Sequence, residues 1–319
     1  MGRTAGAAGR RRVNVDAELL IVGTGALATL TAQRLAAVGV NVVMLGTWPA
    51  GIAALNEHGA ALVETDGSVQ SAPVQATNDP AAVGNIRYAL VLVKAWQTEH
   101  TARQLAQCLP ADGLALTLQN GLGNRENLVA QLGEERVALG TTTTGATLLG
   151  PGRVRSGGEG PIMLGAHPRL APLADLLRQA AFQVNVLADI GPLLWDKLML
   201  NAAINPLAAL LNVPNGELFK RPTARQLMIA LAEETAAVAR AQSITLSFTD
   251  PAETVVAIAK QTQQNIASML QDVRRGAPTE IDAINGAVVR AGRQVGVDTP
   301  VNETMWHLVK ALSNEPLSD

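Results

Sequence analysis

Three polar side chains recur at four-residue intervals within an otherwise apolar stretch: Lys197, Asn201 and Asn205. In a helix this spacing places them on one face, drifting by about 40° per step. A lysine ammonium can stabilise a developing oxyanion and donate a proton, and carboxamides can orient a substrate without adding charge. Asparagine is a poor helix former, so its repetition here needs a reason. The spacing indicates a candidate site, with a solvated helix face as the alternative.

Two later stretches, 265–272 and 279–286, also mix polar residues with packing residues. Thr279 has the right type for the N-cap of a helix that would follow it. Spacing alone does not separate Ser268 or Glu280 from ordinary helix-surface residues. These stretches therefore remain open on this evidence.

A glycine-rich string of the form G-x-G-x-x-A follows the first apolar run of the chain. Gly23 would allow a tight turn, Gly25 would let a pyrophosphate approach the backbone, and Ala28 would permit close helix–strand packing. The following helix would offer free N–H groups and a positive dipole end to phosphates. Alone, the string also fits a turn without function or a methyltransferase loop. Between a strand and a helix it predicts dinucleotide binding. Its residues are Gly23, Thr24, Gly25, Ala26, Leu27 and Ala28.

The end of the second strand usually selects between the two nicotinamide cofactors. An acid there bonds the ribose hydroxyls of NAD, and a nearby Arg favours NADP. The segment 44–48 has neither, which argues against strict use of NAD. Gly46 and Thr47 could offer backbone and hydroxyl donors to a phosphate. We expect NADPH to be preferred over NADH.

The elements around this string predict an α/β fold. A strand at 17–23, a helix at 26–38 and a strand at 40–45 form a unit of the size of a parallel βαβ crossover. Alternating strands and helices then predict a Rossmann-type, doubly wound parallel sheet. The Gly- and Pro-rich segment 150–161 reads as a loop or a hairpin connection between late strands. The further elements expected are strands at 89–93, 114–118, 137–140 and 182–187, and helices at 98–108, 124–132 and 170–180.

The second part of the chain predicts an all-α domain. Helices are expected at 192–211, 222–243, 250–274, 278–295 and 300–312. Pro206 removes a helical N–H, so we expect a kink and a carbonyl on Ala202 without its usual partner. The expected organisation is a disordered tail at 1–16, a dinucleotide-binding domain at 17–190 and a helical substrate and catalytic domain at 191–319.

Composition narrows the class of protein. A chain of 319 residues exceeds one typical core, and 48% hydrophobic with 16% charged residues suits a globular protein. A net charge of −2 gives no reason to expect nucleic acid or an anionic membrane as partner. Cys108 is the only cysteine, which excludes an internal disulfide and fits a reducing compartment. No run of about 18 apolar residues predicts a membrane span. The Arg-rich start lacks a secretory apolar segment, and an organelle presequence is the alternative to a tail.

Together these strings resemble the ketopantoate reductase family. The matching strings occur in family order and cover most of residues 19–310. The resemblance implies reduction of 2-dehydropantoate by NADPH on the route to pantothenate, in the cytoplasm, on a small 2-oxo acid. The strings are 23–28, 64–68, 93–97, 120–123 and 140–143, then 194–198, 201–207, 214–218, 268–272 and 279–286.

The resemblance also implies roles for single residues. Lys197 matches the proton-donating lysine, and Glu280 matches the acid that closes the site near substrate and cofactor. Asn120 matches an asparagine between nicotinamide and substrate. Lys94 matches a cofactor contact, and Ala146 a backbone one. Further substrate contacts would be Asn201, Asn205, Asn215 and Ser268.

Two departures from the family pattern stand out. The Arg that selects NADP in the family aligns with Thr47, so the preference for NADPH should be weaker here. The segment 1–16 has no counterpart in the family. No metal site is expected.

Two rival functions stay open. One is a related reductase that acts on another 2-oxo acid, and the other is a non-catalytic sensor that binds a dinucleotide. The sequence does not give the oligomeric state, and a homodimer is compatible with it.

Overall fold

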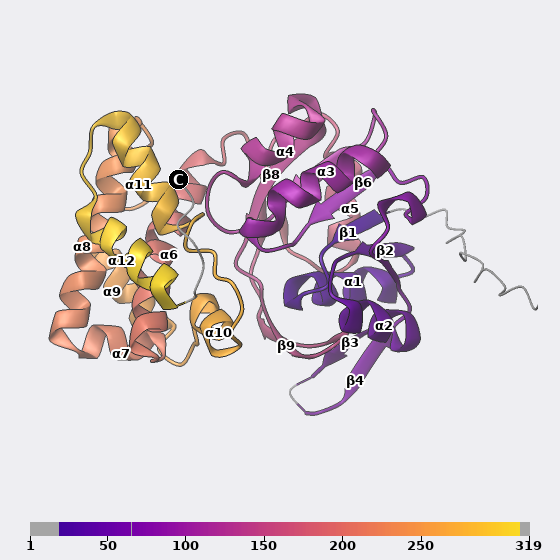
Figure 1. Cartoon of the computed structure of the whole chain (residues 1–319), viewed down its shortest axis with the longest axis horizontal. Helices are drawn as coiled ribbons and strands as arrows, with labels where there is room; N and C mark the ends of the chain where they lie inside the picture. The colour runs from indigo at the N-terminus through magenta and orange to yellow at the C-terminus, as the bar shows by residue number, and fades with distance from the viewer. Residues whose placement is uncertain (1–18, 65, 313–319) are drawn as a thin grey trace, which may run out of the picture.

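The structure is a computed structural model and describes residues 19–64 and 66–312. The tail predicted at 1–16 lies outside the described residues. Figure 1 shows an α/β domain, drawn in indigo to magenta, beside a group of helices drawn in orange to yellow. The two classes of structure expected for the front and the back of the chain are thus both present.

The larger sheet of the α/β domain has eight strands in the order β12-β11-β8-β7-β6-β1-β2-β5. Its pairs are parallel except that β11 runs antiparallel to β8. The predicted doubly wound sheet is confirmed, as a mostly parallel one. The strands are β1 (Leu19–Val22), β2 (Val42–Leu45), β5 (Gln75–Thr77), β6 (Tyr88–Val91), β7 (Leu114–Thr117), β8 (Val137–Thr142), β11 (Ile162–Gly165) and β12 (Val184–Leu187).

Alternate residues of β1 supply two separate cores. Leu19 and Ile21 belong to a core that includes residues of α1 (Ala26–Ala37) and α5 (Ala171–Gln179). Leu20 and Val22 belong to a core that includes residues of α3 (Thr98–Cys108) and α4 (Asn124–Leu132). A parallel sheet covered on both faces needs apolar residues at every strand position, which explains the uninterrupted apolar runs.

A second sheet, in the order β4-β3-β10-β9, was not expected from the sequence. Its core is small: Leu30 of α1 packs with Leu62 and Val154. Strand β4 is mostly exposed, so it carries no apolar signal. The segment 150–161 contains the turn of the β9–β10 hairpin, as one of the two predicted readings had it. The elements are α2 (Pro49–His58), β3 (Ala60–Val63), β4 (Val69–Ala72), β9 (Gly145–Gly150) and β10 (Arg153–Gly158), with 3-10 turns at Pro80–Ala82, Ala95–Gln97 and Glu134–Arg136.

The helical region is built around α6, which packs against α7, α8, α9, α10 and α12. Strand β12 ends at Leu187 and α6 begins at Gly191, and the domain boundary placed near 190 stays a prediction. Among the described residues, no helix is long and apolar enough to cross a membrane. The helices are α6 (Gly191–Leu211), α7 (Asn215–Lys220), α8 (Pro222–Ala241), α9 (Pro251–Gln261), α10 (Ser268–Arg274), α11 (Asn285–Val295) and α12 (Pro300–Leu312).

Two predicted helices were too long. The helix expected at 250–274 is wrong, because α9 ends at Gln261 and α10 starts at Ser268. Between them the backbone turns to bond the start of α7, where Asn215 N donates to the carbonyl of Asn265 at 3.1 Å. The helix expected at 278–295 begins only at Asn285, after a turn at 278–284, so Thr279 caps no helix. Long-range contacts outweigh local helix propensity in both segments.

Pro206 sits inside α6, which continues through it to Leu211. The carbonyl of Ala202, which the proline leaves without a helical partner, accepts the side-chain amide of Asn285 at 3.0 Å. Asn285 also donates to Asn302 Oδ1 at 2.9 Å, and both asparagines are fully buried. A side chain from the start of α11 thus replaces the missing N–H of α6.

Candidate active site

A cavity of about 1100 Å³ lies at the carboxyl ends of five parallel strands. β1 and β6 are neighbours, and the chain order runs in opposite directions on either side of them, which makes this edge a topological switch point. This volume is slightly above the range of roughly 300–1,000 Å³ that is usual for small-molecule sites, as suits an extended ligand. Ala146 of β9 lines one wall, and Ser268 and Glu280 of the helical region line another. Both parts of the molecule therefore contribute to one cavity.

The glycine string forms the floor of this cavity. Gly23 has a φ of +128°, and a Cβ on it would stand 3.1 Å from the carbonyl oxygen of Leu92 and 3.3 Å from Ala28 Cβ. A Cβ on Gly25 would meet nothing within 4 Å, so it would project into open space where α1 begins. Bare backbone at a helix N-terminus, facing a cavity of this size, fits the pyrophosphate of a dinucleotide.

The end of β2 contributes Gly46, Thr47 and Trp48 to the cavity lining. Thr47 is exposed, so its hydroxyl is available. The backbone N–H of Gly46 donates to the carbonyl of Thr77 at 3.0 Å. The expectation that Gly46 offers a free backbone donor is therefore wrong, because the pairing of β2 with β5 already uses that donor.

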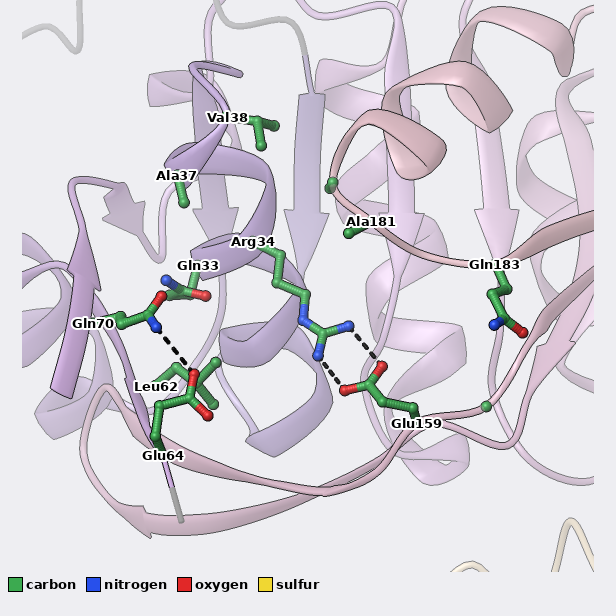
Figure 2. A pocket seen from close by; sticks show the side chains of 12 residues that line it. Gln33, Arg34, Ala37, Val38, Leu62, Glu64, Gln70, Glu159, Ala181 and Gln183 are labelled. Atoms are coloured by element: carbon green, nitrogen blue, oxygen red, sulfur yellow. Dashed lines mark hydrogen bonds and ion pairs between the residues drawn. The ribbon is translucent and has the colours of Figure 1, made fainter. Parts of the chain in front are cut away.

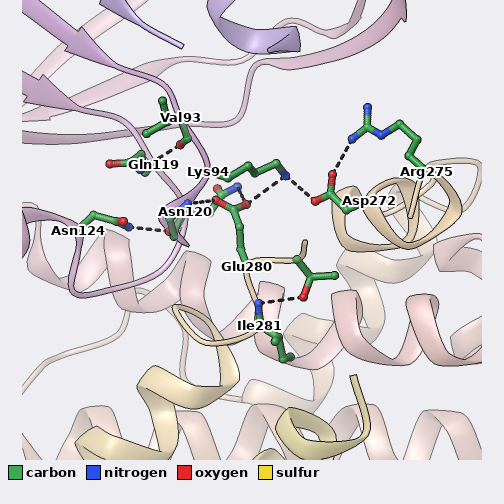
Figure 3. Close-up of polar contacts among 11 residues, drawn as sticks. Val93, Lys94, Gln119, Asn120, Asn124, Asp272, Arg275, Glu280 and Ile281 are labelled. Carbon is green, nitrogen blue, oxygen red and sulfur yellow. Dashed lines mark hydrogen bonds and ion pairs between the residues drawn. The ribbon is translucent and has the colours of Figure 1, made fainter. Parts of the chain in front are cut away.

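A charge cluster joins the two parts of the molecule beside the cavity, and Figure 3 shows it. We use this name for Lys94, Asp272, Arg275 and Glu280. Lys94 Nζ lies 2.6 Å from Asp272 Oδ2 and 3.5 Å from Glu280 Oε2, and Arg275 Nη2 lies 2.6 Å from Asp272 Oδ1. Burial lowers the pKa of Lys94, but the charges of Glu280 and Asp272 outweigh it, so the net pKa is raised. Lys94 is thus a firmly held cation in the cavity wall.

Glu280 is held against the α/β domain by two more donors. The backbone N–H of Ala95 donates to Glu280 Oε1 at 3.2 Å, and Asn120 Nδ2 donates to Glu280 Oε2 at 3.3 Å. The Asn120 loop is itself fixed, because Asn124 Nδ2 donates to the carbonyl of Asn120 at 2.9 Å. Asn120 and Glu280, predicted to belong to one site, therefore lie in hydrogen-bonding contact.

The turn at 278–284 is anchored on its other side as well. Asp282 Oδ1 accepts the indole N–H of Trp306 at 2.6 Å, and Asp282 Oδ2 lies 3.1 Å from Lys310 Nζ. The carbonyl of Asp282 accepts from Arg290 Nη2 at 2.7 Å. The turn thus presents Glu280 to the cavity while Asp282 holds it to α11 and α12.

Lys197 does not line the cavity itself, but it is hydrogen-bonded to a residue that does. Its Nζ donates to Thr141 Oγ1 at 2.8 Å and to the carbonyl of Thr142 at 2.6 Å, and Thr142 lines the cavity. Burial lowers the pKa of Lys197 to about 8, against an opposing effect of the Glu280 charge. The Lys197 ammonium is therefore held beside Thr142, which lines the cavity. It is easier to deprotonate than the ammonium of an exposed lysine.

The remaining predicted substrate contacts are distributed unevenly. Ser268 lines the cavity, whereas Asn201, Asn205 and Asn215 lie outside its lining, like Lys197. Asn215 Nδ2 donates to Thr262 Oγ1 at 3.1 Å, and its buried Oδ1 has no partner among the described residues. Asn215 thus carries a spare acceptor.

Sequence reasoning missed several residues of this site. Asp272 stands in one of the strings noted above and Arg275 follows it by three positions, but nothing local in the sequence pairs Asp272 with Lys94. Thr141 and Thr142 hold the Lys197 ammonium, and they lie in a string noted only for its resemblance. Strand pairing and helix packing bring these residues together, and no spacing in the sequence records that.

A second cavity, of about 480 Å³, lies at the far end of α1 (Figure 2). An ion pair between Arg34 and Glu159 crosses it, and Gln70 Nε2 donates to Glu64 Oε1 at 3.2 Å. None of the predicted site residues lines it. It is therefore separate from the candidate active site.

Comparison with known proteins gives a consistent result. The family model "Ketopantoate reductase PanE/ApbA" matches residues 19–169, and the model "Ketopantoate reductase PanE/ApbA C terminal" matches residues 189–313. A 2-dehydropantoate 2-reductase from Halobacterium salinarum is 33% identical over 303 residues, which cover 92% of this chain and 97% of the relative.

Solved structures agree in fold over nearly the whole chain. A PanE/ApbA family ketopantoate reductase from Ralstonia eutropha superposes with a TM-score of 0.87 at 31% identity, covering 93% of this chain and 98% of its own. A D-mandelate dehydrogenase, described as a ternary structure with NADH and anilino(oxo)acetate, superposes with a TM-score of 0.86 at 26% identity, covering 93% and 98%.

Proposed function

Because the chain belongs to the ketopantoate reductase PanE/ApbA family, we propose that it reduces 2-dehydropantoate to pantoate with NADPH. The family consists of NAD(P)H-dependent reductases of 2-oxo acids. One observation carries the proposal furthest: the glycine string, Asn120 and Glu280 line a single cavity, and Lys197 is bonded to its wall. A cytoplasmic location, as for the family, is part of the proposal.

The cofactor would lie on the glycine string and supply a hydride. Gly23 and Gly25 leave the backbone bare there, and the start of α1 offers N–H groups to its phosphates. Lys94 offers a cation in the same cavity and Ala146 a wall. These residues bind and orient, and they need no charge change during the reaction.

Lys197 is the proposed proton donor. An ammonium has three N–H groups, and Thr141 and Thr142 accept two of them, which leaves a third for the substrate carbonyl oxygen. The lowered pKa of about 8 brings proton transfer closer to neutral conditions while the group remains largely protonated at pH 7. Two fixed acceptors orient the ammonium before the substrate arrives.

Substrate orientation is assigned to the amides and to Glu280. The Glu280 carboxylate can accept the hydroxyl of ketopantoate, and Asn120 holds that carboxylate in place. Asn201, Asn205 and Asn215 stay proposed substrate contacts on the resemblance alone, since none of them lines the cavity. Ser268, at the exposed start of α10, offers a hydroxyl to the substrate carboxylate.

NADPH is the proposed cofactor, with a modest preference over NADH. No acid stands at the end of β2 to repel a 2′-phosphate, and Thr47 offers a hydroxyl. Without an Arg there, a charge-assisted contact worth about 1.5–3 kcal/mol is missing. Thr47→Arg should therefore raise the ratio of kcat/KM for NADPH over NADH. A ratio that favours NADH in the unmodified protein would contradict this part of the proposal.

The likeness to D-mandelate dehydrogenase favours one alternative substrate class, aryl 2-oxo acids. Initial rates with ketopantoate and with phenylglyoxylate, each with NADPH and with NADH, separate the two. The proposal expects the highest kcat/KM for ketopantoate with NADPH. A higher value for phenylglyoxylate would move the assignment to the alternative. Tight cofactor binding without turnover of any 2-oxo acid would identify a sensor.

A further inference from the structure

Asp272 is a carboxylate with almost no exposure, 2% for its side chain, and it has two cations as partners. Its Oδ2 contacts Lys94 of the α/β domain and its Oδ1 contacts Arg275 of its own region, both at 2.6 Å. Each oxygen therefore serves one cation at the short distance of a charge-assisted hydrogen bond.

The Lys94 ammonium lies between two carboxylates but favours one of them. It is 2.6 Å from Asp272 and 3.5 Å from Glu280, and the latter distance is at the limit of hydrogen bonding. The side chain keeps 34% of its exposure and lines the cavity. Asp272 thus takes the strongest contact that Lys94 can offer.

Glu280, by comparison, is loosely bonded. Its contacts with Ala95 N and Asn120 Nδ2 are 3.2 and 3.3 Å, and both donors are neutral amides. A carboxylate has about four acceptor positions, so Glu280 retains capacity for a ligand. It is 5% exposed and lines the cavity, so that capacity faces the site.

We propose that Asp272 is a positioning residue that draws the Lys94 ammonium away from Glu280, and so keeps the Glu280 carboxylate available to the substrate hydroxyl. The inference rests on the proposed function. Two unit charges attract strongly at this range, and 3.5 Å leaves room for the pair to close. Without the charge of Asp272, Lys94 would close on Glu280 and occupy the acceptor that the hydroxyl needs.

The test uses two substrates that differ in that hydroxyl. Ketopantoate carries it, and 3,3-dimethyl-2-oxobutanoate has the same carbon skeleton without it. Asp272→Asn should lower kcat/KM for ketopantoate about tenfold, the scale of one charge-assisted hydrogen bond, mainly through KM. At saturating NADPH, kcat/KM for the substrate without the hydroxyl should change by much less than that factor. The measured quantity is the ratio of the two values.

A second variant tests the route through Lys94. In Asp272→Asn combined with Lys94→Met no ammonium remains to occupy Glu280, so the ratio should return toward that of the unmodified enzyme. Glu234→Gln is the structural control. Its carboxylate accepts the backbone N–H groups of Val301 and Asn302 at the start of α12, away from the cavity. It should lower the melting temperature and leave the ratio unchanged.

The outcomes are distinguishable. If the unmodified enzyme does not reduce ketopantoate, the proposed function fails. If the unmodified enzyme does reduce ketopantoate, and Asp272→Asn lowers kcat/KM for both substrates by the same factor, Asp272 has only a structural role and the inference is overturned. The inference is also overturned if the ratio of the two kcat/KM values stays low when Lys94→Met is combined with Asp272→Asn. Asp272→Ser carries the same expectation if Asp272→Asn does not fold, and failure of both to fold would make Asp272 a structural residue.

Discussion

At the scale of single residues, Lys197 combines a fixed position with an altered acidity. Thr141 and Thr142 accept its two visible hydrogen bonds, and burial lowers its pKa to about 8. A general acid needs both properties, because it must lie within reach of the substrate oxygen and must release its proton readily.

Lys197→Ala should lower kcat for ketopantoate by at least about a hundredfold, the usual scale for loss of a general acid. The fold should persist, since within residues 19–64 and 66–312 the hydrogen bonds of this side chain go to one strand, β8. Steady-state rates beside a thermal melt check both statements. Turnover close to normal in a folded variant would remove Lys197 from the mechanism.

The reductive rate should also depend on pH. The pKa of Lys197 is lowered to about 8, so its protonated form, the one that can donate, is lost as pH rises through that value. The rate of reduction should therefore fall above about pH 8, by roughly tenfold per pH unit in the limit. The profile of kcat/KM against pH measures it, and Lys197→Ala should lack this limb. A flat profile to pH 10 would show that another group donates the proton.

At the scale of elements, the sequence predicts what repeats locally. The apolar runs of β1, β6 and β7 identify buried strands, because both faces of that sheet are covered. The exposed strand β4 carries no such run. The turn at 278–284 resembles a helix in sequence, but its backbone follows bonds to the Asn120 loop and to α12. The spacing predicted that Lys197, Asn201 and Asn205 share a helix, whereas the pairing of Lys94 with Asp272 could not be predicted, since 178 positions separate these two residues.

Gly25→Val tests the start of α1 as a phosphate site. A Cβ at Gly25 meets nothing within 4 Å, so the variant should fold normally. Its branched side chain would then occupy the space that a bound pyrophosphate needs. NADPH affinity should be lost, as measured by fluorescence titration. Gly150→Val is the matched control, because a Cβ there also meets nothing within 4 Å but Gly150 lies outside the cavity lining. Equal NADPH affinity of the two variants would show that residues 23–28 form a turn without a role in cofactor binding.

Asn285→Ala tests the repair of α6. It would leave the carbonyl of Ala202 without a partner in a fully buried position, at a cost of about 1–3 kcal/mol in the free energy of unfolding. Urea denaturation measures the change. Asn127→Ala, at an exposed position of α4, should have little effect. Equal stabilities would show that Ala202 is satisfied in another way.

At the scale of the whole molecule, the two parts meet at Gly121. Its φ is +80°, and a Cβ there would stand 2.2 Å from the carbonyl oxygen of Ala283 in the helical region. The neighbouring N–H of Leu122 donates to that same oxygen at 2.9 Å. Glycine thus allows the Asn120 loop to touch the turn that carries Glu280.

Gly121→Ala should push that turn away from the α/β domain. Because a small misplacement of the groups at a reacting site is costly, we expect kcat/KM for ketopantoate to fall by about tenfold or more. Gly123→Ala is the matched control, since Gly123 has a φ of +91° but a Cβ on it meets nothing within 4 Å. Both variants place a side chain at a positive φ, and only Gly121→Ala also collides with a neighbouring backbone. Equal losses of activity would assign the effect to strain alone.

The bond between Asp282 and the indole of Trp306 gives this turn an optical reporter. Trp306 is 6% exposed and accounts for one of the four tryptophans of the chain. A carboxylate 2.6 Å from an indole N–H lies close enough to change the emission of that ring when the turn shifts. In a variant in which Trp48, Trp96 and Trp195 are replaced, Trp306 is the remaining tryptophan. Its fluorescence would then report movement of the turn that carries Glu280 during turnover. A stopped-flow trace could then separate movement of the turn from the hydride step, which the absorbance of the nicotinamide follows.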